Sequence, residues 1–262
     1  MFARLERDAW TDPTVAAAYA SLWQEFVAPS IAALLDGAGV RPGDRVLDVA
    51  AGPGTVSRAI ADRGGRPVAL DFSAAMLPFV DSTVPKIRAD SARLPVRDGT
   101  FERVVSNLGL LHFPLPEAAI REAARAVRPG GVVAFSVWGA DAAALTIVPE
   151  SLRALALAPP APSAPGFFRF SDPGAFESAF RAAGMVPMPS QRLAWEGPVQ
   201  SPEAFWRMFR EGSARTRASI LALSESDRDR VHAEVLRRVG AFRRAGRWAV
   251  PTTIVIGRGR RR

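Results

Sequence analysis

The sequence contains no cysteine, and several other reactive residue types are scarce. Among its 262 residues there are two histidines and one tyrosine, and Lys86 is the sole lysine. The absence of cysteine excludes disulfides, thiolate metal sites and cysteine nucleophiles, and no metal site is expected. No apolar run approaches the roughly 20 residues that a membrane-spanning helix needs. The first eight residues, 1–8, carry charges of both signs and no apolar signal core, so the expected location is the cytoplasm.

The formal net charge of +8 is weak evidence for a nucleic-acid partner. Half of this excess lies in the last six residues, 257–262, which contain four arginines. Because terminal segments of this kind are often mobile, we expect a dispensable basic tail. Residues 224–244 interleave arginines with acids such as Glu225 and Glu234, which is typical of a solvated helix face.

A strand, a glycine loop and a helix follow one another near residue 50. The apolar run 45–49 predicts a buried parallel strand. Gly52 and Gly54 allow the next loop to turn tightly, and they let its backbone approach a ligand closely. The spacing of residues 55–63 predicts a helix whose first N–H groups face that loop. This order is typical of the nucleotide-binding corner of a doubly wound α/β domain.

Polar side chains end the next predicted strands as well. The strand 66–70 ends in Asp71, which lies 23 residues after Asp48, the length of one βα unit. The strand 86–89 ends in Asp90 and Ser91, and the strand 101–106 ends in Asn107. Further strands are predicted at 132–137, 185–195 and 252–257, the second at a sheet edge because its prolines cannot donate hydrogen bonds.

These motifs resemble class I S-adenosylmethionine (AdoMet) methyltransferases. Asp48, followed four residues later by Gly52 and then by Gly54, is similar to their first motif. Ala50 stands where the family often has another glycine, and Ser57 replaces the third glycine of a dinucleotide fingerprint.

The resemblance covers residues 44–138. Residues 101–107 with 110–113 are similar to the fourth-strand motif of small-molecule methyltransferases. Residues 126–131 are similar to their turn into the fifth strand.

The resemblance implies a Rossmann-like, mostly parallel seven-stranded sheet with helical lid elements, and AdoMet as the cofactor. In this arrangement Asp71 would accept hydrogen bonds from the ribose hydroxyls, and Asp90 with Ser91 would read the adenine. The expected cofactor-binding residues are Asp48, Ala50, Gly52, Gly54, Asp71, Phe72, Met76, Asp90, Ser91 and Asn107.

We expect a single methyltransferase domain over 1–262, with N-terminal lid helices in 1–36, the AdoMet-binding core in 37–138 and a helical lid insertion in 201–245. Helical spacing predicts helices over 13–26, 29–35, 74–80, 140–157 and 173–183. The segment 159–165 is rich in proline and predicts a rigid connection.

Aromatic residues outside the core are candidates for the acceptor pocket, since small-molecule sites are mostly apolar. Those with helical spacing are Tyr19, Trp23, Phe205, Trp206 and Phe209. His112 follows the fourth strand and is the candidate general base.

The predicted function is in-line methyl transfer from AdoMet to a small, apolar or aromatic metabolite. A nucleic-acid methyltransferase is a disfavoured alternative, because Asn107 is followed by Leu-Gly-Leu rather than by a proline-aromatic motif. An AdoMet-binding protein that transfers no methyl group is the other alternative. No membrane partner is expected, and a homodimer stays open.

Overall fold

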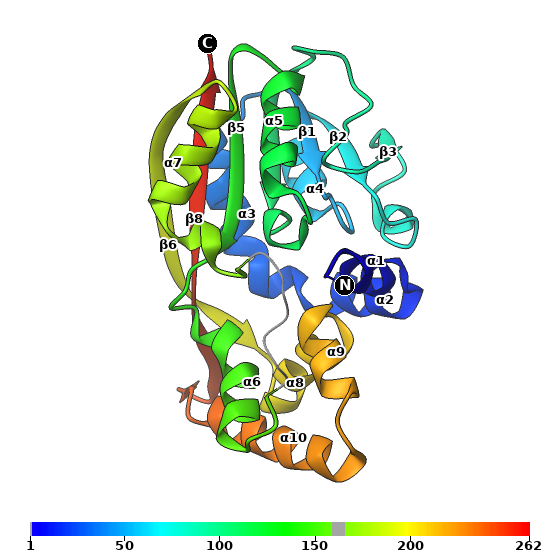
Figure 1. Cartoon of the computed structure of the whole chain (residues 1–262), viewed down its shortest axis with the longest axis vertical. Helices are drawn as coiled ribbons and strands as arrows, with labels where there is room; N and C mark the ends of the chain where they lie inside the picture. Colours follow the sequence, from blue (N-terminus) through cyan, green and yellow to red (C-terminus); the bar gives the residue numbers. More distant parts are fainter. Residues whose placement is uncertain (1, 159–165) are drawn as a thin grey trace. The chain divides into compact units, whose positions relative to one another are not determined.

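The computed structural model describes residues 2–158 and 166–262, so the predicted proline-rich connection 159–165 lies outside the described residues. The chain divides into two compact units, whose elements are labelled in Figure 1. Unit 1 comprises Met1–Ala28, Asp141–Ser163 and Ala194–Thr253, and unit 2 comprises Pro29–Ala140, Ala164–Leu193 and Ile254–Arg262.

Within the described residues, the strands form one sheet in the order β3-β2-β1-β4-β5-β8-β6, and the two-residue β7 pairs with β8. The pairs β1·β2, β1·β4, β2·β3 and β4·β5 are parallel, whereas β5·β8 is antiparallel. This confirms the predicted mostly parallel, doubly wound sheet with β6 at its edge. The strand bounds are β1 Arg45–Val49, β2 Arg66–Asp71, β3 Lys86–Arg88, β4 Phe101–Asn107, β5 Val127–Trp138, β6 Met185–Val199, β7 Arg243–Arg244 and β8 Arg247–Arg261.

Helices cover both faces of the sheet in unit 2. In Figure 1, α5 (Pro116–Ala126) and α7 (Pro173–Ala182) lie in front of the sheet, and α3 (Gln24–Ala38) runs behind it. Buried residues of β1, β4 and β5 form one apolar cluster with α5 and α7. Burying each large apolar side chain contributes about 1.5–3 kcal/mol, so this cluster fixes the positions of the central strands.

Unit 1 is mainly helical. Within it α2 and α10 contact α8, and α6 contacts α10. Residues 201–245 are helical as predicted, apart from the short β7 near their end. The helix bounds are α1 Phe2–Thr11, α2 Pro13–Leu22, α6 Ala143–Ala154, α8 Pro202–Glu211, α9 Arg215–Leu221 and α10 Glu225–Gly240.

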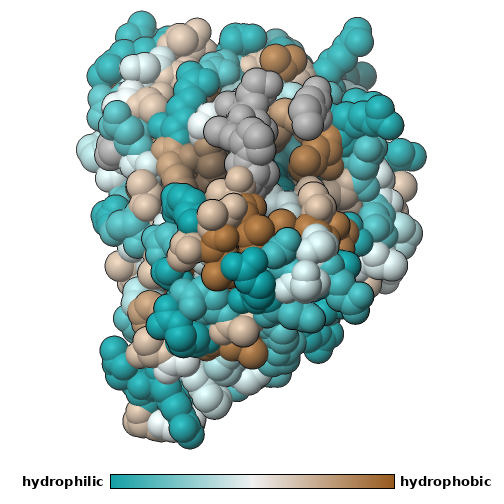
Figure 2. Space-filling model, turned by 60° about the horizontal axis from the view of Figure 1, so that its bottom comes forward, coloured by the Kyte–Doolittle hydropathy of each residue, from teal (hydrophilic) through white to brown (hydrophobic). Residues whose placement is uncertain are grey.

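In the described parts of the chain, no helix has the length and apolarity needed to cross a bilayer. Hydrophilic residues cover much of the surface shown in Figure 2. Large exposed apolar side chains include Leu115, which is 62% exposed, and Phe79.

Three predicted helices differ in the structure. The helix predicted over 13–26 is interrupted at Trp23, where α2 ends and α3 then begins at Gln24. The other two differences lie near prolines. Residues 74–80 form only the 3₁₀ turn Leu77–Phe79, because Pro78 has no N–H to donate to an α-helical bond. Ser73 still caps this segment, since its Oγ accepts the N–H groups of residues 75 and 76 at 3.1 Å each. A helix break was also predicted before Pro29, but α3 continues through this residue and ends before Gly39, whose φ is +65°.

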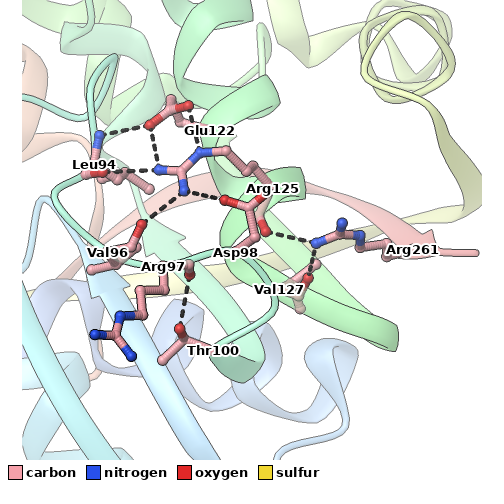
Figure 3. Close-up of polar contacts among 9 residues, drawn as sticks. All are labelled: Leu94, Val96, Arg97, Asp98, Thr100, Glu122, Arg125, Val127 and Arg261. Carbon is pink, nitrogen blue, oxygen red and sulfur yellow. Dashed lines mark hydrogen bonds and ion pairs between the residues drawn. The ribbon is translucent and has the colours of Figure 1, made fainter.

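The expected mobile tail is wrong, because β8 continues to Arg261 and pairs with β5 up to Val132↔Arg260. Gly257 and Gly259 lie against the rings of Phe176 and Phe180 in α7, and a Cβ on either glycine would overlap those rings. The Arg261 guanidinium donates from Nη1 to the carbonyl oxygens of residues 125 and 127, both at 2.6 Å (Figure 3). The arginine-rich end is therefore an ordered strand of the sheet.

Replacing Arg261 by alanine should lower the free energy of unfolding by about 1.5–3 kcal/mol, because two charge-assisted hydrogen bonds are lost. Its neighbour Arg260 is exposed, so Arg260→Ala serves as the matched control and should change stability by less than about 0.5 kcal/mol. Urea unfolding of both variants measures the difference. Equal stability of the two variants would show that the arginine end is a tail after all.

Candidate functional site

Three polar side chains end neighbouring strands at one edge of the unit 2 sheet. Asp48 lies one residue before the end of β1, and Asp71 and Asn107 are the last residues of β2 and β4. The parallel register pairs Asp48 with Ala69 on one side and with Val105 on the other. Ligands bind at the carboxyl ends of strands in open α/β sheets. This edge is therefore the candidate site.

The loop after β1 has an unusual backbone. Gly52 and Gly54 have φ values of +53° and +81°, and Ala50 also has a positive φ of +57°. Gly54 is the N-cap of α4 (Thr55–Asp62), and its N–H donates to the carbonyl of Ala51 at 2.9 Å. The left-handed backbone of Ala50 explains why a glycine is the more common choice at this position in the resembled family.

Asp71 closes this loop from the neighbouring strand. Its Oδ2 accepts the N–H of Gly52, and its Oδ1 accepts the N–H of Ser73, both at 2.8 Å. The side chain is buried, and burial raises the pKa of Asp71, while the two hydrogen bonds and the charge of His112 act in the opposite direction. Each carboxylate oxygen has a second lone pair, so Asp71 can accept further donors.

Asp48 is the most deeply buried acid of the site. Its Oδ2 accepts the Oγ–H of Ser57 at 2.7 Å, but Oδ1 has no hydrogen-bond partner among the described residues. Burial raises the pKa of Asp48 to about 7, and the nearby Asp71 carboxylate adds to this shift. A buried acceptor of this kind needs a donor from a ligand or from water.

Hydroxyl groups hold the amide of Asn107 in place. Its Oδ1 accepts the hydroxyls of Ser136 at 2.7 Å and Ser30 at 3.1 Å. The Ser136 Oγ also accepts the N–H of Leu108, whose φ is +57°, at 3.0 Å. The chain therefore turns sharply after β4 while the amide plane of Asn107 stays fixed.

The end of β3 meets β2 through the backbone. The N–H of Ala89 donates to the carbonyl of Asp71 at 3.1 Å, and Asp90 follows, exposed. The Asp90 Oδ1 accepts the N–H of Ala92 at 2.8 Å, so this carboxylate closes a tight turn around the half-buried Ser91. Of the two remaining predicted cofactor residues, Phe72 is half-buried and Met76 is buried.

His112 lies in the 3₁₀ turn Leu110–His112, immediately after β4, and is half-buried. The other two residues of this turn line a small pocket in unit 2. Apolar side chains make up most of its wall, and Arg169 supplies a charge that is paired with Glu117. The lining residues are Leu110, Leu111, Pro116, Val137, Gly166, Phe167, Arg169 and Phe170.

The aromatic residues predicted to bind the acceptor lie together in unit 1. Trp23 contacts Phe209 edge-on, with 5.2 Å between ring centroids, and stacks on Tyr19 at 6.0 Å. Phe205 lies 4.9 Å from Phe209. All but the half-buried Tyr19 are buried, and the Trp206 ring stacks on His232. The structure thus shows an aromatic cluster within unit 1, and its role toward an acceptor stays a prediction.

Part of the chain is similar to known methyltransferases. Residues 47–135 match the family described as a methyltransferase domain. Demethylmenaquinone methyltransferase of Beutenbergia cavernae is 42% identical over 102 residues, or 38% of this chain. The matched region is 42% of that relative, so the chain spans less than half of its length.

Solved structures share the fold at low sequence identity. The YcgJ protein of Bacillus subtilis is 19% identical, with a TM-score of 0.54 over 90% of this chain and 99% of that one. Phosphoethanolamine N-methyltransferase 2 of Haemonchus contortus, solved with S-adenosylhomocysteine, is 15% identical, with a TM-score of 0.59 over 100% of this chain and 60% of that one.

Residues 47–135 are therefore similar to a methyltransferase domain, and this similarity implies AdoMet as the methyl donor. The residues at the strand ends fit this group. A glycine loop at a helix N-terminus, the carboxylates of Asp48 and Asp71 and the Asn107 amide converge at one edge of the sheet, and the buried Asp48 Oδ1 still needs a donor. The residues that hold these groups, Ser57 and Ser136, were not predicted from the sequence as site residues.

The raised pKa of Asp48 makes the stability of the ligand-free protein depend on pH. The folded pKa of about 7 for this residue lies above the ordinary value of 3.8, so its contribution to stability is fully present below pH 4 and is lost as the pH rises to about 7. Asp48→Asn removes this titration and should gain stability over the parent protein with rising pH, by on the order of 1.4 kcal/mol for each pH unit between about 4 and 7.

Urea unfolding of the ligand-free protein between pH 4.5 and 8 measures this difference. The gap between the two proteins should widen up to about pH 7 and then level off. Ser57→Ala, which removes the hydrogen bond but keeps the carboxyl, should retain the pH dependence. Two parallel pH curves for Asp48→Asn and the parent protein would contradict the raised pKa.

Proposed function

We propose that this protein transfers the methyl group of AdoMet to a small, apolar or aromatic acceptor. The observation that carries the proposal is the buried Asp71 carboxylate, which holds the glycine loop through the N–H of Gly52 and keeps lone pairs for a ligand. The relative named demethylmenaquinone methyltransferase acts, by its name, on a small molecule, which supports the acceptor class.

Different residues of the site would bind different parts of AdoMet. Asp71 would accept the ribose hydroxyls, and the Asp90–Ser91 turn would contact the adenine. The glycine loop and the first N–H groups of α4 offer donors to an anionic group, as helix N-termini do. Asn107, fixed by Ser136 and Ser30, would present its amide at the end of β4.

When bound, AdoMet supplies a sulfonium-activated methyl group that needs little covalent assistance from the protein. The chain's own task is then to hold the acceptor in line and to exclude water, and orientation of this kind can supply several kcal/mol of the ~7–11 available to proximity. The apolar pocket beside the 3₁₀ turn of His112 has a volume of only about 10 Å³, roughly the room for one water, so in this form it is too small for such an acceptor. For an acceptor that must lose a proton, the His112 imidazole would take it.

Calorimetry with S-adenosylhomocysteine tests the cofactor assignment. Asp71→Asn keeps the shape of the side chain but loses the charge that accepts the ribose hydroxyls, so we expect binding to weaken by about 1.5–3 kcal/mol, roughly 10- to 150-fold. Asp81→Asn is a matched control in the same unit, because Asp81 is exposed and caps a local turn at Thr83. Equal affinity of all three proteins would remove Asp71 from the cofactor site.

Replacing His112 by glutamine tests the proton transfer. With an acceptor such as a phenol, kcat should fall by ~10²–10⁴-fold, while the affinity for S-adenosylhomocysteine stays the same. His232→Gln is the control, because His232 pairs with Glu203 on the surface of unit 1. An unchanged kcat for His112→Gln at neutral pH would leave catalysis to proximity and orientation.

The acceptor class itself needs a direct assay. Incubation with labelled AdoMet and either a panel of aromatic metabolites or total RNA separates the proposed function from a nucleic-acid methyltransferase. Binding of S-adenosylhomocysteine without label transfer in either arm would support an AdoMet-binding protein that catalyses no methyl transfer.

A further inference from the structure

A polar network at the end of α5 fixes the loop between β3 and β4. The Arg125 guanidinium donates to the carbonyl oxygens of Leu94 at 2.9 Å and Val96 at 2.7 Å, and to the Asp98 carboxylate at 2.7 Å (Figure 3). Glu122, one helical turn earlier, receives two further bonds from Arg125, at 2.9 and 2.8 Å. One arginine therefore contacts three positions of a loop that has no regular secondary structure of its own.

The loop is also held through its backbone N–H groups. The N–H of Leu94 donates to Glu122 Oε2 at 2.8 Å, and the N–H of Gly99 donates to the carbonyl oxygen of Arg125 at 2.9 Å. That carbonyl also accepts the Arg261 guanidinium from the end of β8. Leu94, which is 4% exposed, is thus fixed through its N–H, its carbonyl and its buried side chain.

The anchored residue Leu94 lies four residues after Asp90. Between them the chain forms one tight turn, in which Asp90 accepts the N–H of Ala92 with its side chain and the N–H of Arg93 with its carbonyl, at 2.8 and 3.0 Å. On its other side, Asp90 follows the backbone bond from Ala89 to Asp71. Little freedom is left between these two anchors, so the bonds at Leu94 determine where Asp90 and Ser91 lie.

We infer that Arg125 and Glu122 are positioning residues for cofactor binding: they act through Leu94 to hold the Asp90–Ser91 turn at the edge of the sheet. This inference rests on the proposed function, in which that turn contacts the adenine of AdoMet. In this assignment both residues act through the loop and not by direct contact with the cofactor. An arginine is required at position 125 because its planar guanidinium spans two carbonyls and two carboxylates, a geometry that a lysine ammonium cannot reproduce.

The test compares Arg125→Lys with a matched variant at the opposite ends of the strands. Arg103, at the start of β4, also donates to backbone carbonyls, those of Gly39 and Glu102, and pairs with Asp44 at 3.6 Å. Arg103→Lys should therefore lower the thermal stability without any effect on the Asp90 turn. Asp98→Ala is a milder third variant, since the Asp98 side chain is 67% exposed and makes a single contact with Arg125.

Calorimetry with S-adenosylhomocysteine and amide hydrogen exchange of residues 90–99 are the two readouts. If the turn adopts its binding arrangement about one-tenth of the time in Arg125→Lys, the affinity falls roughly tenfold. Exchange in 90–99 should be faster in the same variant, and Asp98→Ala should show smaller changes of the same sign. Arg103→Lys should leave both the affinity and this exchange unchanged.

The outcomes separate the inference from the proposed function. If the parent protein binds S-adenosylhomocysteine and Arg125→Lys binds it equally well, the positioning role is wrong and the proposed function stands. Equal losses of affinity in Arg125→Lys and Arg103→Lys would also overturn the positioning role, because general destabilisation then explains both. If the parent protein does not bind S-adenosylhomocysteine, the proposed function is wrong and the inference falls with it.

Discussion

The parallel register of the central strands is the constraint on which the site depends. Because β1 pairs in parallel with both β2 and β4, the carboxyl ends of all three strands come to one edge, although Asp48, Asp71 and Asn107 are far apart in the sequence. The apolar interior of these strands supplies the stability, and the polar residues begin where the strands end. Any slip of one residue in this register would turn the side chains of that strand to the other face and separate the three groups.

The same arrangement requires two carboxylates to be buried next to each other. Burial raises the pKa of both Asp48 and Asp71. Ionisation of these two carboxyl groups near neutral pH therefore lowers the stability of the ligand-free fold. The two acids are compensated differently: Asp71 receives two backbone N–H groups, whereas Asp48 receives the hydroxyl of Ser57, and its Oδ1 has no partner in the part of the chain that the structure describes. A cationic ligand at this edge would relieve the repulsion, which is consistent with a site built for a sulfonium compound.

Much of this could be predicted from the sequence, because strand ends, glycine loops and acid spacings are local signals. The strands β1 to β5 were predicted from short runs along the sequence, and the polar residues Asp71 and Asn107 mark where two of them end. The predictions that were wrong concern features that depend on tertiary contacts. The composition of residues 257–262 predicts a mobile tail. In the structure these residues belong to β8, and Gly257 and Gly259 leave room for the phenylalanine rings that α7 packs directly on this strand. Likewise, Pro29 predicts the first turn of a new helix, but α3 begins at Gln24 and continues through this residue.

Ser57, Ser136 and Arg125 illustrate why supporting residues are hard to find from sequence. Each acts through a partner that is 9, 29 or up to 31 residues away, and none lies in a pattern that distinguishes it from an ordinary surface residue. Arg125 lies in the last turn of a helix that carries one other arginine, the exposed Arg121, so its charge alone predicts only a favourable interaction with the helix dipole. Its role depends on where the β3–β4 loop passes, and that path is fixed only when Leu94 is buried in the core. The residues proposed to contact a cofactor can thus be predicted from strand ends, whereas those that hold them in place become visible only once the loops are folded.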